Sequence, residues 1–137
     1  MRNPKLMLAA ACLLAGAIAS PVALAEAPGP AVKALFTKAL PDYPGKEALM
    51  LQVEYPPGGA DPIHRHDAHA FVYVIEGSIV MGVKGGKEVT LKAGETFYEG
   101  PNDVHTVGRN ASKTKPAKFV VVLLKDAGKP ALIPTDK

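Results

Sequence analysis

The sequence predicts a single all-β domain, built as a sandwich or a barrel, that follows an N-terminal export signal. Several short runs of β-forming residues alternate with clusters of glycine and proline, at the spacing typical of sandwiches and barrels. Beyond residue 25, no long segment shows the helical period of about 3.6 residues in its apolar positions. The chain also has no internal repeat and no low-complexity segment.

Residues 1–25 have the pattern of a secretory signal peptide. Arg2 and Lys5 give a basic start, an apolar run follows, and residues 23–25 form a small-x-small cleavage site. The apolar run is too short to span a membrane, so we expect no membrane span and a mature chain that begins at Glu26. A lipid anchor on Cys12 is a weaker alternative, because the residues before it do not fit a lipoprotein signal. These features predict a periplasmic or secreted protein.

The mature chain has little charge and no cysteine. Removing Arg2 and Lys5 takes Lys plus Arg from 16 to 14 against 13 acidic residues, so the net charge falls from +3 to +1. Such a balance offers no basic surface to a nucleic acid, and we expect no nucleic-acid partner. Without disulfides, the domain must be held together by a packed core or by oligomerisation.

Turn signals divide the mature chain into a lead, a barrel domain and a tail. The lead is residues 26–45, within which residues 31–40 could form one helical turn or a strand. The β-barrel domain is residues 46–125 and the tail residues 126–137; we expect the lead and the tail to be mobile or draped over the domain. Glycine-containing turns follow the first four of its five predicted strands, which are residues 48–55, 70–75, 79–83, 88–91 and 119–124.

Two histidines at alternate positions are the most informative feature of the chain. His64 and His66 lie at i and i+2, so on a strand both imidazoles point to one face and can bind a single metal ion. His105 can join them from a neighbouring strand, and the chain has only four histidines. Neutral imidazole is the commonest metal ligand of proteins near neutral pH. The three histidines therefore predict a divalent-metal site; the alternative is that His64 and His66 lie in an exposed turn after Pro62.

The strand predicted over residues 70–75 is apolar on both faces. If the alternation set by His64 and His66 continues into this strand, its even-numbered residues face inward and its odd-numbered residues outward. An outward row of apolar side chains needs cover from a second sheet or from another subunit. We expect a homodimer, with the second sheet as the alternative cover for Phe71, Tyr73 and Ile75.

These residues carry a resemblance to the cupin superfamily. Gly58, residues 64–66 and Gly77 resemble the first cupin motif: a glycine, a His-x-His pair, a glutamate and a closing glycine. Gly94 and residues 100–105 resemble the second motif, whose histidine completes the metal site. The resemblance implies a small, single-domain, RmlC-like cupin. Its fold would be a double-stranded β-helix, a jelly-roll barrel with the three histidines bound to metal inside its mouth.

One ligand of the family pattern is missing. Counting back from Gly77, the position of the family's glutamate ligand holds Ala70, whose methyl group cannot bind a metal. His69 is a candidate fourth ligand if a bulge turns it inward; otherwise it is a surface histidine at a strand start. Glu99 could reach the site directly, or through a water as a catalytic general base, or it could be a solvated carboxylate beside a turn.

Three imidazole ligands leave open positions on a divalent metal for water or substrate. Iron, manganese, zinc, nickel and copper all suit such ligands. The resemblance implies an enzyme that acts on a small molecule, similar to cupin dioxygenases, isomerases or decarboxylases. The alternative is a non-catalytic module that binds a small ligand or a metal, and the missing glutamate argues against redox enzymes that use it. Arg65 and Arg109 could bind an anionic substrate or make surface ion pairs.

Overall fold

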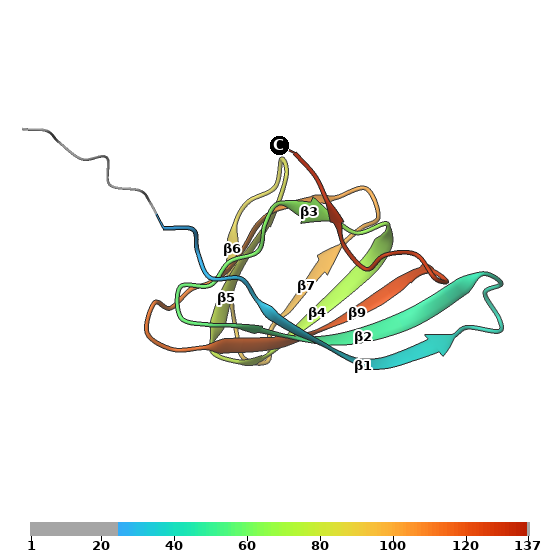
Figure 1. The fold of residues 1–137 in the computed structure, drawn as a ribbon, viewed down its shortest axis with the longest axis horizontal. Helices are drawn as coiled ribbons and strands as arrows, with labels where there is room; N and C mark the ends of the chain where they lie inside the picture. The colour runs from blue at the N-terminus through green and yellow to red at the C-terminus, as the bar shows by residue number, and fades with distance from the viewer. Residues whose placement is uncertain (1–24, 137) are drawn as a thin grey trace, which may run out of the picture.

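The computed structural model describes residues 25–136, which form two antiparallel five-stranded sheets (Figure 1). The first sheet has the order β1-β2-β9-β4-β7 and the second the order β10-β3-β8-β5-β6. The predicted signal, with Arg2, Lys5 and Cys12, lies outside the described residues. The strands are β1 (Ala31–Ala39), β2 (Lys46–Tyr55), β3 (His64–Arg65), β4 (Ala68–Glu76), β5 (Ser78–Val83), β6 (Val89–Lys92), β7 (Thr96–Glu99), β8 (Val104–Asn110), β9 (Ala117–Asp126) and β10 (Ile133–Pro134).

The two sheets confirm the all-β prediction and its jelly-roll form. Each of the five predicted strands overlaps an observed one, namely β2, β4, β5, β6 and β9. Four further strands, β3, β7, β8 and β10, are not among the five predicted ones, and β7 and β8 lie in the part of the chain that contains Glu99 and His105. Over residues 25–136, no helix has the length and apolar character needed to cross a membrane.

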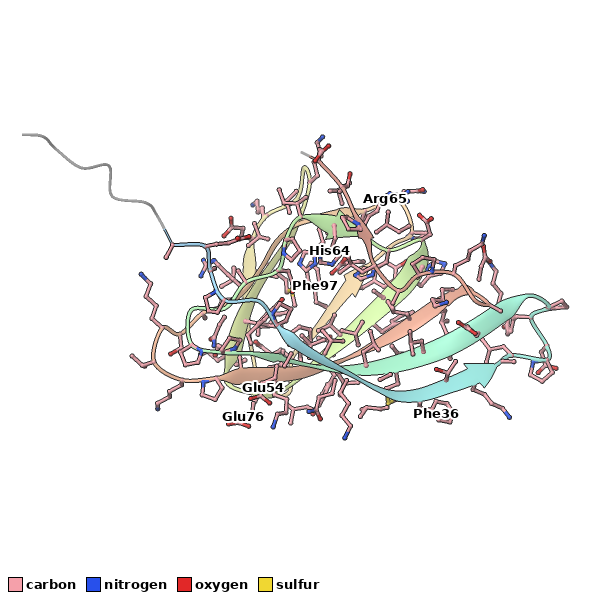
Figure 2. All side chains as sticks on the ribbon, viewed as in Figure 1. Phe36, Glu54, His64, Arg65, Glu76 and Phe97 are labelled. Atoms are coloured by element: carbon pink, nitrogen blue, oxygen red, sulfur yellow. The ribbon has the colours of Figure 1, made fainter. Side chains whose placement is uncertain are left out.

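The lead forms an edge strand. Residues 31–40 were compatible with a helical turn or a strand, and most of them form β1, which pairs antiparallel with β2 from Ala31 opposite Glu54 onward. Every residue of β1 is exposed, and Figure 2 shows Phe36 on the outside of the molecule. β1 is therefore the edge strand of the first sheet, with β2 as its one hydrogen-bonded neighbour.

The core lies between the sheets, and β4 shows how the sequence fills it. Its even-numbered residues face inward: Ala70 and Val74 are fully buried and Val72 is 3% exposed. The odd-numbered Phe71, Tyr73 and Ile75 are about half exposed, which confirms the predicted alternation. The other fully or nearly fully buried core side chains come from β2, β4, β5, β6 and β9: Val53, Tyr55, Ala68, Ile79, Met81, Leu91, Ala117, Phe119, Val121 and Leu123.

Gly77 and Asn110 tie two loops to this core. Gly77, the closing glycine of the first motif, has a φ of 74°, and a Cβ there would lie 2.7 Å from the Pro116 carbonyl oxygen. Only glycine fits both the left-handed backbone and the close approach. Asn110 is buried at the end of β8, and its side-chain amide donates to the carbonyl oxygens of Tyr55, Pro56 and Lys115 at 3.3, 3.0 and 2.8 Å.

The tail is draped over the domain and lies against the barrel mouth. The ammonium group of the buried Lys125 donates to Glu47 Oε1 and to the carbonyl oxygens of Asp126 and Lys129, which fixes the start of the tail. Further on, β10 pairs antiparallel with β3, with Ile133 opposite Arg65. The residues just before β10 are thereby held over the histidines.

Candidate metal centre

The structure brings the three predicted histidines together at the barrel mouth. His64 lies on β3 directly opposite His105 on β8, and His66 follows the end of β3. His64 and His105 are only 2% and 3% exposed, so the exposed-turn alternative is wrong. One ring nitrogen of each histidine lies within 4.8 Å of the others.

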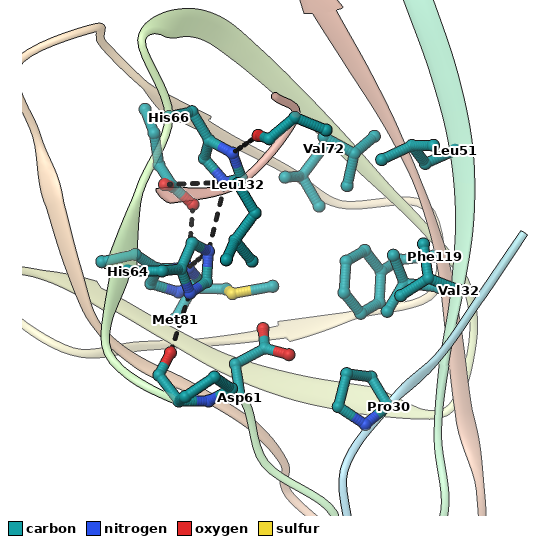
Figure 3. Close-up of a pocket in the computed structure, with 16 residues that line it drawn as sticks. Pro30, Val32, Leu51, Asp61, His64, His66, Val72, Met81, Phe119 and Leu132 are labelled. Carbon is teal, nitrogen blue, oxygen red and sulfur yellow. Dashed lines mark hydrogen bonds and ion pairs between the residues drawn. The ribbon is translucent and has the colours of Figure 1, made fainter. Parts of the chain in front are cut away.

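Backbone carbonyls fix the tautomers of two of these rings. His64 Nδ1 lies 2.8 Å from the Pro62 carbonyl oxygen, and His66 Nδ1 lies 2.5 Å from that of Ala131. A carbonyl oxygen can only accept, so both Nδ1 atoms carry the hydrogen, and each neutral ring has its lone pair on Nε2. These two Nε2 atoms are 3.2 Å apart (Figure 3). Two lone pairs at this separation repel each other unless a cation lies between them.

The separations between the ring nitrogens suit a shared metal ion. His105 Nδ1 lies 3.3 Å from His64 Nε2. Two ligand nitrogens, each about 2.0–2.1 Å from one ion, are about 2.9 Å apart at a right angle and about 3.4 Å apart at the tetrahedral angle. Two of the three separations, 3.2 and 3.3 Å, fall in this range, and all three ligand nitrogens lie within 4.8 Å of one another.

Burial keeps the three imidazoles neutral. Desolvation lowers the pKa of His64 and of His66, and it lowers the pKa of His105 to about 4, with a smaller contribution from the neighbouring His64. Neutral imidazole is the form that binds a metal. The cluster therefore offers free lone pairs at neutral pH.

Glu99 is part of the same cluster. It ends β7 and is 2% exposed, so the alternative of a solvated carboxylate is wrong. Its Oε1 lies 3.3 Å from His105 Nδ1, and its Oε2 lies 3.9 Å from His66 Nε2. Burial raises the pKa of Glu99 to about 7, and the charges of Asp103 and Asp61 add to the shift. Among the described side chains, Oε2 of Glu99 and Nε2 of His105 are the two buried polar atoms with no hydrogen-bond partner.

The structure does not bring His69 to the cluster. Its ring is exposed and its Nδ1 lies 2.7 Å from the Tyr98 hydroxyl oxygen, on the outer face of the sheet. The regular pairing of β4 with β9 at this position leaves no bulge that could turn the ring inward. Arg65 pairs with Asp67, and Arg109 lies 3.9 Å from Glu88, so both arginines make surface ion pairs.

His64 and His66 occupy one side of a cavity of about 300 Å³ (Figure 3), which Glu99 and His105 beside them also line. The opposite side is apolar, with Val32 of β1, Leu51 of β2 and Phe119 of β9 facing His64 and His66 across the space. No lysine or arginine within residues 25–136 lines this cavity. Its other lining residues are Pro30, Val53, Asp61, Pro62, Val72, Met81, Val121, Ala131 and Leu132.

The sequence did not single out Asp61, which also faces the cavity. Its Oδ2 accepts a hydrogen bond of 2.5 Å from the Tyr55 hydroxyl, and burial raises its pKa. Gly108 makes room for this pair: a Cβ there would lie 2.8 Å from Asp61 Oδ2 and 2.8 Å from His105 Cε1. The position of Asp61, three residues before His64, is the only sequence signal that could have identified it.

Comparisons with known proteins agree with this geometry. A family model described as a cupin domain matches residues 51–123. No curated protein sequence matched the chain. Solved structures with a similar fold include an oxalate oxidase in complex with the substrate analogue glycolate, with 27% identity over 76% of this chain and 54% of the oxidase, at a TM-score of 0.58.

Two further similar structures are enzymes of other kinds. The polyketide cyclase RemF from Streptomyces resistomycificus is 21% identical over 82% of this chain and 78% of its own, with a TM-score of 0.60. The DMSP lyase DddQ from Ruegeria pomeroyi is 18% identical over 64% of this chain, with a TM-score of 0.56. This chain spans 43% of the lyase. Structural similarity at these levels of sequence identity shows a shared fold.

Proposed function

The chain belongs to the cupin family, and we propose that it is a metal-binding cupin in which His64, His66 and His105 hold one divalent ion. One observation carries the proposal. The Nδ1 atoms of His64 and His66 are tied to backbone carbonyls, which leaves two Nε2 lone pairs facing each other at 3.2 Å. Burying two such groups without a cation is unfavourable. Iron, manganese, zinc, nickel and copper are the candidate ions.

We further propose that the protein acts on a small molecule as a dioxygenase, isomerase or decarboxylase does. The metal would supply a Lewis acid for a substrate oxygen or for water. Val32, Leu51 and Phe119 would hold the apolar body of the substrate opposite the histidines. Since no lysine or arginine among the described residues lines the cavity, the chain itself favours a substrate with an apolar body over a small dianion.

Elemental analysis tests the metal site. The protein, purified without a histidine tag, is compared with a His105→Ala variant and with a His69→Ala variant as a matched control. His69 is exposed and outside the cluster, so H69A should keep nearly one equivalent of metal while H105A loses it. A wild-type protein that carries no metal and binds none when it is added would disprove the proposal, as would equal losses in H69A and H105A.

A non-catalytic module that binds a small ligand is the second candidate. The apolar side of the cavity supports it, because such a wall can bind a ligand whether or not chemistry follows. Glu99 favours the enzyme, since a buried acid beside the metal ligands can transfer protons. Metal-loaded protein that binds an apolar ligand and returns it unchanged would decide for the binding module.

Export and dimerisation complete the proposal. The signal pattern of residues 1–25 supports a periplasmic or secreted protein, and mass spectrometry of the exported chain should find Glu26 at its N-terminus. The exposed row of Phe71, Tyr73 and Ile75 supports a homodimer through the outer face of β4, because the second sheet covers the other face. Light scattering of the wild type and of Tyr73→Glu tests this: the variant should be monomeric.

A further inference from the structure

Glu99 reaches the histidine cluster from the strand next to Ala70. In the antiparallel pairing of β4 with β7, Ala70 and Glu99 are direct partners. Side chains of direct partners lie on the same face of a sheet, with Cβ atoms about 4.5–5.5 Å apart. Both residues are buried and face the inside of the barrel. The carboxylate of Glu99 therefore enters the region that a longer side chain at position 70 would fill.

The surroundings of this carboxylate lack a cation of their own. Glu99 Oε2 is buried without a hydrogen-bond partner, and no lysine or arginine of the described chain lines the cavity. The nearest side-chain nitrogen atoms belong to His66 and His105, two of the histidines that would hold the ion. A buried carboxylate in such a place calls for a partner with positive charge.

The distances place the carboxylate among the metal ligands. Its oxygens lie 3.3 Å from His105 Nδ1 and 3.9 Å from His66 Nε2. Two pairs of nitrogen atoms in the cluster are separated by 3.2 and 3.3 Å, and all three atoms lie within 4.8 Å of one another. The carboxylate is thus about as far from the ring nitrogens as they are from one another, which is the arrangement of atoms that share one ion.

We propose that Glu99 is the fourth protein ligand of the metal, and that it supplies from β7 the carboxylate that position 70 of β4 lacks. This inference rests on the proposed function, because it assigns a ligand to the same ion. A carboxylate beside three imidazoles adds a hard oxygen ligand and one negative charge. Carboxylate oxygens suit manganese, and imidazoles combined with one carboxylate suit ferrous iron.

An exchange of the two side chains tests the assignment. Metal-free wild type, Glu99→Gln, and the double variant Ala70→Glu/Glu99→Ala are titrated with Mn²⁺, and free Mn²⁺ is measured by electron paramagnetic resonance. The Kd of E99Q should rise at least about tenfold. The exchange variant should recover to within about threefold of wild type, because its carboxylate returns to the same space from β4. Glu76→Gln, at the far end of β4 with an exposed side chain, is the control and should bind as wild type does.

The outcomes separate this inference from the proposed function. E99Q binding as tightly as wild type, with H105A still losing the metal, would overturn the assignment of Glu99 and leave the three-histidine site standing. An exchange variant as weak as E99Q would also overturn it, because a Glu99 that only orients His105 cannot be replaced from position 70. Absence of binding in wild type would overturn both. Circular dichroism of each variant establishes that it is folded. The visible spectrum of Co²⁺-loaded E99Q should differ from that of Co²⁺-loaded wild type, and the spectrum of the exchange variant should resemble the wild-type one.

Discussion

The raised pKa of Glu99 predicts that this carboxylate destabilises the metal-free fold at alkaline pH. Its pKa rises from 4.5 to about 7 because the group is buried. The folded state therefore binds the proton more tightly than the unfolded chain does, and stability falls as the pH rises from 4.5 through 7. At 1.36 kcal/mol for each pKa unit, the full loss is about 3 kcal/mol, most of it between pH 5 and 8.5.

Glu99→Gln isolates this loss, since it removes the titrating group and keeps the size of the side chain. Urea unfolding of metal-free wild type and E99Q is measured at pH 5 and at pH 8.5. The two should differ little at pH 5, and E99Q should be more stable by about 2 to 3 kcal/mol at pH 8.5. The difference between the two proteins matters, because Asp61 also has a raised pKa and is present in both.

If the unfolding free energies of the two proteins change in parallel with pH, the reasoning is refuted, because a Glu99 whose titration is not coupled to folding cannot be buried and unpaired.

Adding Mn²⁺ at pH 8.5 gives a second check. Binding at 100 times the Kd stabilises the folded state by about 2.7 kcal/mol. Wild type should gain more from the ion than E99Q, if the ion is the missing partner of the carboxylate.

Three further predictions concern the surroundings of the site. Gly108→Ala places a methyl group 2.8 Å from Asp61 Oδ2 and His105 Cε1, so Mn²⁺ titration should show weaker binding, whereas an alanine at Gly29, where a Cβ meets nothing within 4 Å, should leave binding unchanged. Asn110→Ala leaves three carbonyl oxygens without their donor and should lower the unfolding free energy by about 3 kcal/mol, measured in urea; a loss below about 1 kcal/mol would show that water replaces the amide. Val32→Asp changes a residue of the apolar wall that is 57% exposed, so it should weaken binding of tropolone to the metal-loaded protein about tenfold without changing the Kd for Mn²⁺; equal tropolone binding would mean that ligands do not use this wall.

The sequence predicted those parts of the site that follow from local alternation. His64 and His66 at i and i+2, and the inward Ala70 and Val72, depend only on the period of a strand. His105 was found because a metal site needs a ligand from a second strand, and the chain has few histidines to offer.

Glu99 could not be assigned to the site in the same way. It belongs to a strand of four residues followed by Gly100 and Pro101, a run too short and too close to turn residues to be recognised as β7. Its burial depends on pairing with Ala70, which lies far away in the sequence, and local patterns carry no information on such a pairing. The contributions of β1 and of the tail to the cavity were missed for the same reason, since both arise from contacts between distant segments.

The tail is more than a cover for the cavity, because it takes part in setting the chemistry of His66. The Ala131 carbonyl oxygen accepts the Nδ1 hydrogen of His66 at 2.5 Å, and this bond leaves the lone pair of Nε2 free for the cluster. The tail itself is held by the pairing of β10 with β3, the strand that carries His64. Docking of the tail and binding of a metal therefore favour the same arrangement of His66, so each must strengthen the other. In a domain without a disulfide among residues 25–136, an ion bound at this point would join β3, β8 and the tail, and would contribute to the stability of the fold as well as to its function.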